Sequence, residues 1–158
     1  MKRETIFLRI AIYIMALIML AICIIVIPHH LIGANKLMHN LFYNWILGSG
    51  MYLTALLFFT VLWQALKLLH LIDQNKAFSK FSVNNLKKIK IAAYLACLIY
   101  ILESPFFYMF ADKDDAPGVV VIGIILAGTA LVIALFASML QKLLNQAIKI
   151  KSENDLTI

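Results

Sequence analysis

The sequence contains four predominantly apolar segments, each close to the roughly 20 residues that a helix needs to cross a membrane. They cover residues 6–27, 51–71, 89–110 and 119–140, and they are apolar on every helical face. Hydrophobic residues make up 63% of the chain and charged residues 14%, against roughly 45–50% and about 25% in soluble domains. The alternating pattern of transmembrane β-strands is absent. The sequence therefore predicts an all-α, four-span transmembrane helical bundle, a single membrane domain over residues 1–158 in contact with the lipid bilayer.

The region between the first two spans carries signals for helix ends. Pro28 cannot donate the backbone hydrogen bond that continues a helix, so we expect the first span to end there. Leu37, Leu41 and Trp45 recur every four residues, which predicts a short interfacial helix in the first outer loop. The Gly-Ser-Gly sequence at residues 48–50 then predicts a flexible turn into the second span.

Basic residues are concentrated on one side of this predicted topology. All but two of the 14 lysines and arginines lie near the N-terminus, in or beside the connector over residues 72–88, or in the tail over residues 141–158. The exceptions are Lys36 and Lys113, which fall in the two outer loops. Because Lys and Arg accumulate in cytoplasmic loops, the pattern predicts that both termini are cytoplasmic.

Glu103 is the one acidic residue within the predicted spans. An ionisable group at such a position is costly and points first to a functional role. Pro105 is expected to kink the helix, which would let Ser104 or a freed backbone group bond the carboxyl. One interpretation is a proton- or cation-linked site. The other, which we favour because a single acid without a basic partner is weak support for transport, is a protonated carboxyl that packs the bundle.

Small residues recur along one face of the fourth span, at Gly123, Ala127, Ala130, Ala134 and Ser138. Small residues at this spacing let helices approach closely. They predict the packing face of the bundle, and a contact between copies of the chain in a homo-oligomer is the alternative.

Known catalytic and metal-binding patterns are missing. The outer histidines, His29, His30 and His39, have no fixed ligand spacing, so we predict no metal site and no cofactor. The chain has no Gly-rich phosphate loop, zinc-protease helix or nucleophile elbow, and it is too short for an added soluble domain. We therefore expect that it is not an enzyme.

The connector and the tail are the two polar stretches that could bind a partner. The connector is strongly basic, with Ser82 as the expected helix N-cap. It either docks an anionic lipid or an acidic surface, or simply sets the topology. The tail ends in apolar residues after an acidic stretch, which is typical of an extended segment that docks on a partner or folds back onto the connector. The candidate partner-binding residues are Asp73, Phe78, Ser79, Lys87, Lys88, Glu153, Asn154, Asp155, Leu156 and Ile158.

These two stretches also resemble a known family, the uncharacterised bacterial integral membrane proteins with domain of unknown function two-nine-seven-five. The resemblance rests on the ending over residues 151–158 and, in the connector, on Leu71-Ile72-Asp73, Ala77-Phe78-Ser79 and Leu86-Lys87-Lys88-Ile89. It implies an inner-membrane protein without assigned activity or defined catalytic residues. It also implies a gene that often lies beside one for a small helix-turn-helix regulator.

The resulting functional hypothesis is an interaction protein of the bacterial inner membrane. Its cytoplasmic connector and tail would bind and sequester the helix-turn-helix regulator, with no direct contact between this chain and nucleic acid. The alternative is a small transport or immunity-type protein that works through Glu103 and the outer histidines.

Overall fold

The computed structural model describes residues 2–38 and 41–155, and every regular element in this part of the chain is a helix. The elements are α1 (Lys2–Ala21), the π-helical segment η1 (Ile22–Val26), α2 (Ile27–Met38), α3 (Leu41–Asp73), α4 (Lys80–Lys113) and α5 (Gly118–Asp155). Four candidate spans are long and apolar enough to cross a membrane: Thr5–Gly33, Phe42–Asp73, Lys80–Lys113 and Gly118–Glu153. The predicted all-α, four-span fold is therefore confirmed.

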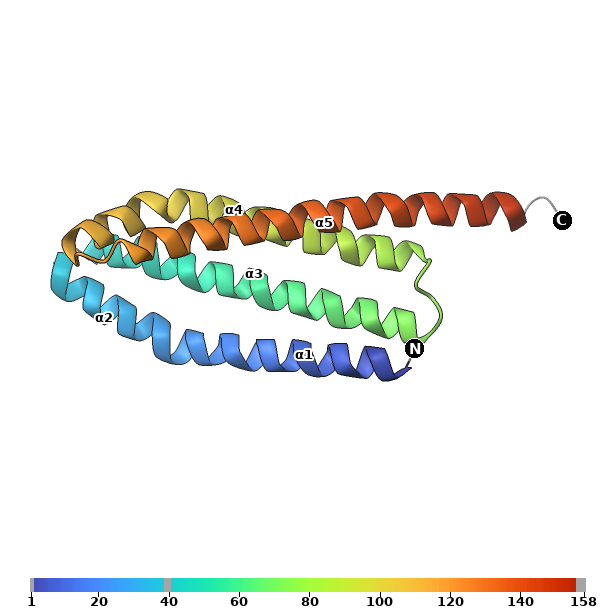
Figure 1. Cartoon of the computed structure of the whole chain (residues 1–158), viewed down its shortest axis with the longest axis horizontal. Coiled ribbons are helices and arrows are strands. Elements are labelled where there is room, and N and C mark those ends of the chain that lie inside the picture. The colour runs from blue at the N-terminus through green and yellow to red at the C-terminus, as the bar shows by residue number, and fades with distance from the viewer. Residues whose placement is uncertain (1, 39–40, 156–158) are drawn as a thin grey trace.

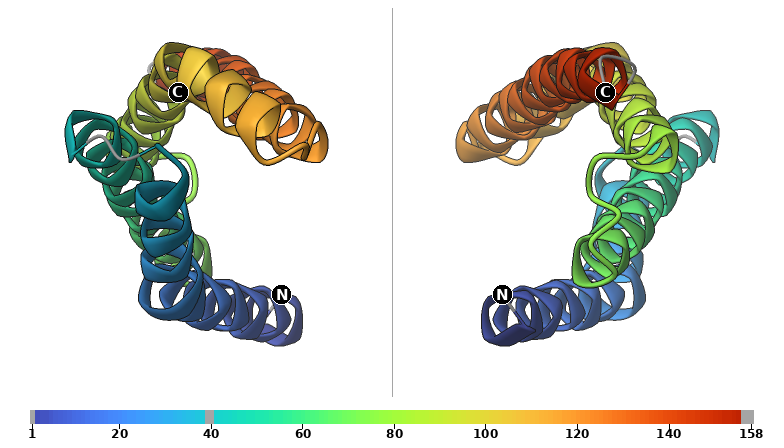
Figure 2. Two further views of the ribbon diagram at one scale, coloured as in Figure 1. Left: turned by 90° about the vertical axis from the view of Figure 1, so that its left-hand side faces the viewer. Right: turned by 90° about the vertical axis from the view of Figure 1, so that its right-hand side faces the viewer.

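The helices run up and down in chain order and form an open, curved bundle (Figures 1 and 2). α3 and α4 pack together in the middle, α1 and α2 lie on α3, and α5 lies along α4. One end, called here the connector end, carries the start of α1 and the α3–α4 connector. The other, the hairpin end, is where α2 leads to α3 and α4 leads to α5 (Figure 1). Seen end-on, α1 and α5 lie at opposite ends of the curve (Figure 2).

The first helix does not end at Pro28, contrary to the prediction. Its backbone changes to π-helical hydrogen bonding over Ile22–Val26, where the Ile27 N–H donates to the Ile22 carbonyl, and then continues as α2. Proline lacks an N–H and crowds the carbonyl four residues earlier. A π-helical turn shifts the hydrogen-bonding register just before that point, so the helix bends instead of ending.

The second candidate span is also longer than predicted. α3 is one continuous helix from Leu41 to Asp73, and residues 48–50 are helical rather than a flexible turn. The helical spacing noted around Trp45 is real, but from Leu41 onward those residues form the first turns of α3 and not a separate interfacial helix. Gly48 and Gly50 allow close contacts instead, because a Cβ at Gly48 would lie 3.2 Å from Leu31 Cδ1 on α2.

The small residues of α5 form a packing face, as predicted. Gly123, Ala130 and Ala134 are buried, and α5 makes its main contact with α4. A Cβ at Gly123 would lie only 3.0 Å from Phe107 Cδ2 on α4. Helices that approach this closely gain dispersion contacts along their length, which is the main attraction available between helices in lipid.

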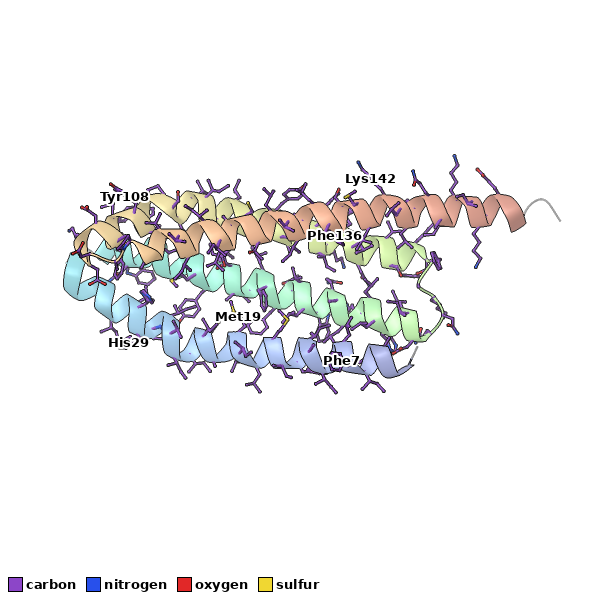
Figure 3. All side chains as sticks on the ribbon, viewed as in Figure 1. Phe7, Met19, His29, Tyr108, Phe136 and Lys142 are labelled. Carbon is purple, nitrogen blue, oxygen red and sulfur yellow. The ribbon has the colours of Figure 1, made fainter. Side chains whose placement is uncertain are left out.

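Large apolar side chains cover the outside of the helices. Phe7 on α1 and Phe136 on α5 are 74% and 65% exposed (both labelled in Figure 3). α5 has 38 residues and is therefore about 57 Å long, well beyond the ~30 Å of a bilayer core. Its last turns extend past the connector end (Figure 1). This surface is stable in lipid and would be costly in water.

Both short connections use hydrogen-bonded helix caps. Asn75 has φ 57°, the Asn75 N–H donates to the Ile72 carbonyl and the Lys76 N–H to the Leu71 carbonyl, which is a Schellman cap on α3. Asp115, with φ 53°, ends α4 in the same left-handed conformation. The chain therefore turns at residues 74 and 75, directly after α3.

The N-cap of α4 is Ser79 and not Ser82. The Ser79 hydroxyl accepts from the Ser82 N–H at 3.4 Å, while Ser82 is fully buried and its hydroxyl donates to the Lys76 carbonyl. The non-helical connector is thus short and tied to the start of α4 by these bonds.

An ion pair joins α1 to α3 at the connector end. Arg9 Nη2 donates to Asp73 Oδ2 at 2.6 Å, and both side chains are partly buried. The pair links two residues 64 positions apart. It helps to fix the position of the first span, which is otherwise lightly packed because most of its apolar side chains are not buried in the protein.

We expect Arg9→Gln and Asp73→Asn each to lower the free energy of unfolding by about 1 kcal/mol, because a partly buried, charge-assisted hydrogen bond is lost. The double variant should lose little more than either single one. Unfolding of the purified protein in mild detergent measures this. Fully additive losses would show that the two side chains are not coupled.

Candidate functional site

Glu103 lies in the contact between α4 and α3. Its side chain is buried, with 3% exposed, and it faces Gly50 on α3. A methyl group at Gly50 would overlap the Glu103 carboxyl group. Only a glycine leaves room for a carboxyl at this position, so the two residues form one structural unit.

The Glu103 carboxyl has no hydrogen-bond partner among the described protein groups, although both of its oxygens are buried. Ser104, which was expected to bond it, instead donates to the Ile101 carbonyl at 2.8 Å. Pro105 cannot donate to that carbonyl, so Ser104 satisfies the acceptor that the proline leaves open. A buried charge without a partner costs several kcal/mol. Glu103 is therefore a group that a proton, a cation or a polar ligand would stabilise.

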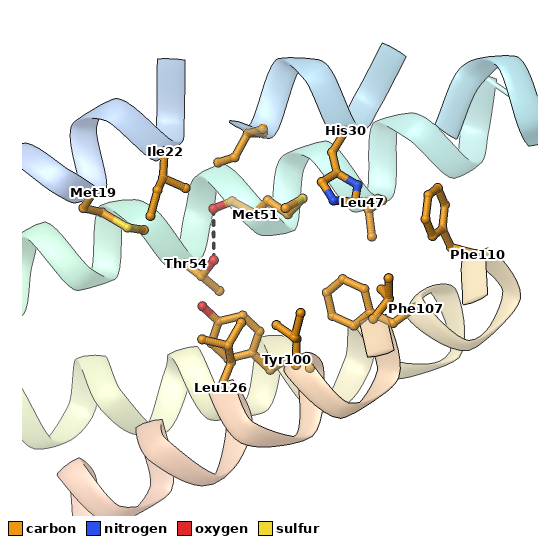
Figure 4. A pocket seen from close by; sticks show the side chains of 14 residues that line it. Met19, Ile22, His30, Leu47, Met51, Thr54, Tyr100, Phe107, Phe110 and Leu126 are labelled. Carbon is orange, nitrogen blue, oxygen red and sulfur yellow. Dashed lines mark hydrogen bonds between the residues drawn. The ribbon is translucent and has the colours of Figure 1, made fainter. Parts of the chain in front are cut away.

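A cavity of about 250 Å³ lies on the same face of α3 and α4. Its walls are mostly apolar, and three polar side chains contribute to them: His30, Thr54 and Tyr100 (Figure 4). The Thr54 hydroxyl donates to the Met51 carbonyl at 2.9 Å, and the Tyr100 hydroxyl faces Thr54. Its other lining residues are Met19, Ile22, Ile27, Leu47, Met51, Phe107, Phe110, Val119, Ile122, Gly123 and Leu126. This cavity suits a mostly apolar molecule that can hydrogen-bond to the few polar side chains in its wall.

Two of the outer histidines, His29 and His30, lie on α2. His29 is exposed on α2 (Figure 3), whereas the His30 ring packs against Phe110, with ring centroids 5.6 Å apart. His39 lies outside the described residues. No group of three or more His, Cys, Asp or Glu residues in the described part of the chain could hold a metal ion.

The connector residues singled out in the sequence do lie together at the connector end, but they differ in role. Asp73 is paired with Arg9, and Ser79 caps α4. Phe78, Lys87 and Lys88 are exposed. The last three are therefore the ones that remain available to a partner.

As far as Asp155, the tail is helical and not the extended segment that the sequence predicts. α5 stays helical to Asp155, and Glu153 Oε1 lies 3.9 Å from Lys149 Nζ on the same helix. α5 continues past the connector end and does not fold back onto the connector (Figure 1). The side chains of Asn154 and Asp155, and all of Leu156 and Ile158, lie outside the described residues.

Sequence reasoning missed Gly50, Thr54 and Tyr100. Gly50 was interpreted as part of a flexible turn, although a glycine inside an apolar run also marks a close approach. No signal in the sequence pairs it with Glu103, because the two lie on different helices and meet only in the folded chain.

The comparisons with known proteins agree with this architecture. The model of the family described as "Protein of unknown function (DUF2975)" matches residues 34–158. The chain belongs to this family. It is also 45% identical, over 158 residues and 99% of each chain, to a protein of Bacillus subtilis (strain 168) named "Uncharacterized membrane protein YoaS". No solved structure matches the chain significantly. The resemblance seen in the connector and tail is thus confirmed, and the protein is a multi-pass membrane protein.

We expect Gly50→Ala to lower the free energy of unfolding by about 1–3 kcal/mol, because the added methyl overlaps the Glu103 carboxyl. Gly128→Ala on α5 is the matched control, since nothing lies within 4 Å of a Cβ there. It should be neutral or slightly stabilising. Thermal unfolding in detergent compares the two, and Glu103→Ala in the Gly50→Ala chain should recover most of the loss. Equal effects of the two glycine substitutions would refute the close contact.

Proposed function

We propose that this protein is a non-enzymatic anchor of the bacterial inner membrane that binds a small helix-turn-helix transcription regulator at its connector end. Binding would hold the regulator at the membrane and away from DNA. The partner's identity is suggested by the family resemblance in the connector and tail. The observation that carries the proposal is the exposed end of α5.

Residues 149–153 of α5 are all exposed. Because an α-helix has 3.6 residues per turn, five consecutive exposed residues mean that this part of the helix is open on every side. It carries Lys149 and Lys151 beside Ile150, which is 60% exposed. A protruding helix with both apolar and basic groups offers the contacts that helix-in-groove recognition uses.

The distribution of charge supports a cytoplasmic connector end. Lys76, Lys80, Lys87 and Lys88 are exposed there, whereas Asp112, Asp114 and Asp115 are exposed at the hairpin end. Short loops rich in lysine remain on the cytoplasmic side. A basic surface also favours an acidic face of the regulator, which leaves the regulator's own basic, DNA-binding face out of the contact.

We expect a crosslinked pull-down from native membranes to capture a small helix-turn-helix protein with the full-length chain and to lose it with a chain ending at Ile148. This truncation removes the part of α5 that is exposed all round and keeps the half-buried Ala147 and Ile148, so the bundle should still fold. Mass spectrometry of the captured proteins provides the readout.

The control is a chain in which a Gly/Ser segment of equal length replaces residues 149–158. It tests whether capture depends on the sequence of this segment or only on its length. It should behave like the truncated chain. Equal capture by all three chains, or no helix-turn-helix protein in any sample, would sink the proposal.

Glu103 favours a second candidate function, a small transport or immunity-type protein. A buried carboxyl that lacks a protein partner, close to an apolar cavity in the spanning region, is an arrangement that a proton or cation pathway could use. Glu103→Gln keeps the shape and removes the charge. If Glu103 drives transport, this change should abolish ion flux in vesicles and alter drug sensitivity in cells, while leaving regulator capture unchanged. Unaltered flux and sensitivity would leave Glu103 a packing residue.

A further inference from the structure

We propose that a groove at the connector end, between α1, α3 and α4, binds an anionic phospholipid, whose phosphate is held between Lys67 and Lys88. The groove has a volume of about 540 Å³ and is separate from the cavity near Glu103. The inference does not rest on the proposed regulator.

Three helices build the groove. α3 contributes Trp63, Lys67 and His70, whose spacing of four and three residues places them on one face. α4 contributes Asn84 and Lys88, which share a face in the same way. Tyr13 of α1 completes the wall. The site therefore exists only in the folded chain, because α1 must lie along α3 to close it.

The groove is positively charged. Lys67 and Lys88 line it, and none of the described residues that line it is Asp or Glu. The carboxylate of Asp73, close by at the end of α3, is paired with Arg9 at 2.6 Å. The two lysines are thus left to bind an external anion, and Asn84 adds an amide that can donate to a phosphate oxygen.

The same groove has an apolar side suited to the glycerol and the first part of the acyl chains. Trp63 is 61% exposed, and Tyr13 is 62% exposed beside it. Lys67 Nζ lies 5.6 Å from the centre of the Trp63 ring, so the ammonium group is already positioned over an aromatic face. Tryptophan and tyrosine gather where hydrocarbon meets headgroups.

The position along α3 agrees with a lipid site rather than a site for free phosphate. α3 has 33 residues and is about 50 Å long, so its ends extend beyond the ~30 Å hydrocarbon layer. Lys67 and His70 lie within two turns of the Asp73 end of α3, and Trp63 lies one turn further from that end. A hydrocarbon layer of ~30 Å centred on α3 would end close to Lys67, which would put the phosphate site at headgroup level. A phospholipid can contact both the lysines and the aromatic side of the groove, whereas inorganic phosphate can contact only the lysines.

Trp63 can report on the lipid directly. The chain has two tryptophans, so Trp45→Phe leaves Trp63 as the single tryptophan, which can be excited selectively over the tyrosines. This protein is reconstituted in phosphatidylcholine vesicles that contain increasing amounts of phosphatidylglycerol brominated on the acyl chain near the glycerol. Brominated phosphatidylcholine in matched vesicles is the headgroup control. We expect quenching by phosphatidylglycerol to saturate at a lower mole fraction than quenching by phosphatidylcholine.

Two double variants remove the same charge from different places. Lys67→Gln with Lys88→Gln empties the groove of its lysines, and Lys80→Gln with Lys87→Gln removes two exposed lysines that do not line it. The first should raise the half-saturating mole fraction of phosphatidylglycerol by roughly tenfold, and the second should change it little. Equal changes in the two variants would mean general attraction to a charged surface and would overturn the site.

Two further outcomes would also overturn the proposal. If inorganic phosphate raises the thermal stability of the protein in pure phosphatidylcholine vesicles, and this effect needs Lys67 and Lys88, the groove takes free phosphate. If the two brominated lipids quench Trp63 equally, the groove does not select anionic lipid, and an acidic protein segment becomes the better occupant.

Discussion

The packing of α4 against α3 on one side and α5 on the other is the contact on which the rest of the structure depends. Apolar side chains gain little by leaving lipid, so membrane helices associate through close approach and satisfied polar groups. The α4–α5 contact achieves this with Gly123 and the fully buried Ala134. On the α3 side the Tyr43 hydroxyl donates to the Phe106 carbonyl at 2.6 Å. With α4 placed by both neighbours, α1 and α2 need only lie along α3, and the result is an open curve with a cavity on its inner face (Figures 2 and 4).

The same packing leaves the Glu103 carboxyl buried without a hydrogen-bond partner among the described residues. The close approach of α3 at Gly50 buries the carboxyl completely, and Ser104 is committed to the backbone carbonyl that Pro105 leaves without a donor. The helix therefore satisfies its own backbone while the carboxyl is left without a protein partner. The two ends of the molecule differ in surface charge. The connector end has lysines beside exposed aromatic rings, whereas the hairpin end exposes Asp112 and its neighbours.

Much of the fold could be predicted from the sequence, because the length of an apolar run directly reports a spanning helix. The four spans and the small-residue face of α5 both follow from local chemistry. The errors came where tertiary packing overrides a local signal. Pro28 is predicted to end a helix, but the π-helical hydrogen bonding of η1 just before it lets the helix continue. Gly50 was expected to form a turn, but in α3 it makes room for Glu103. Local preference alone cannot distinguish these uses of proline and glycine.

The sequence by itself determined the class of the protein, the number of its spans and its family, because these depend on composition, periodicity and short motifs. Only the tertiary structure decided which polar groups meet. Arg9 reaches Asp73 across 64 residues, Glu103 faces Gly50, and Lys67 and Lys88 line one groove with Tyr13. The physical reason is that a helix fixes only which of its own residues share a face. The rotation and height of one helix against another are set by the packing of all of them together.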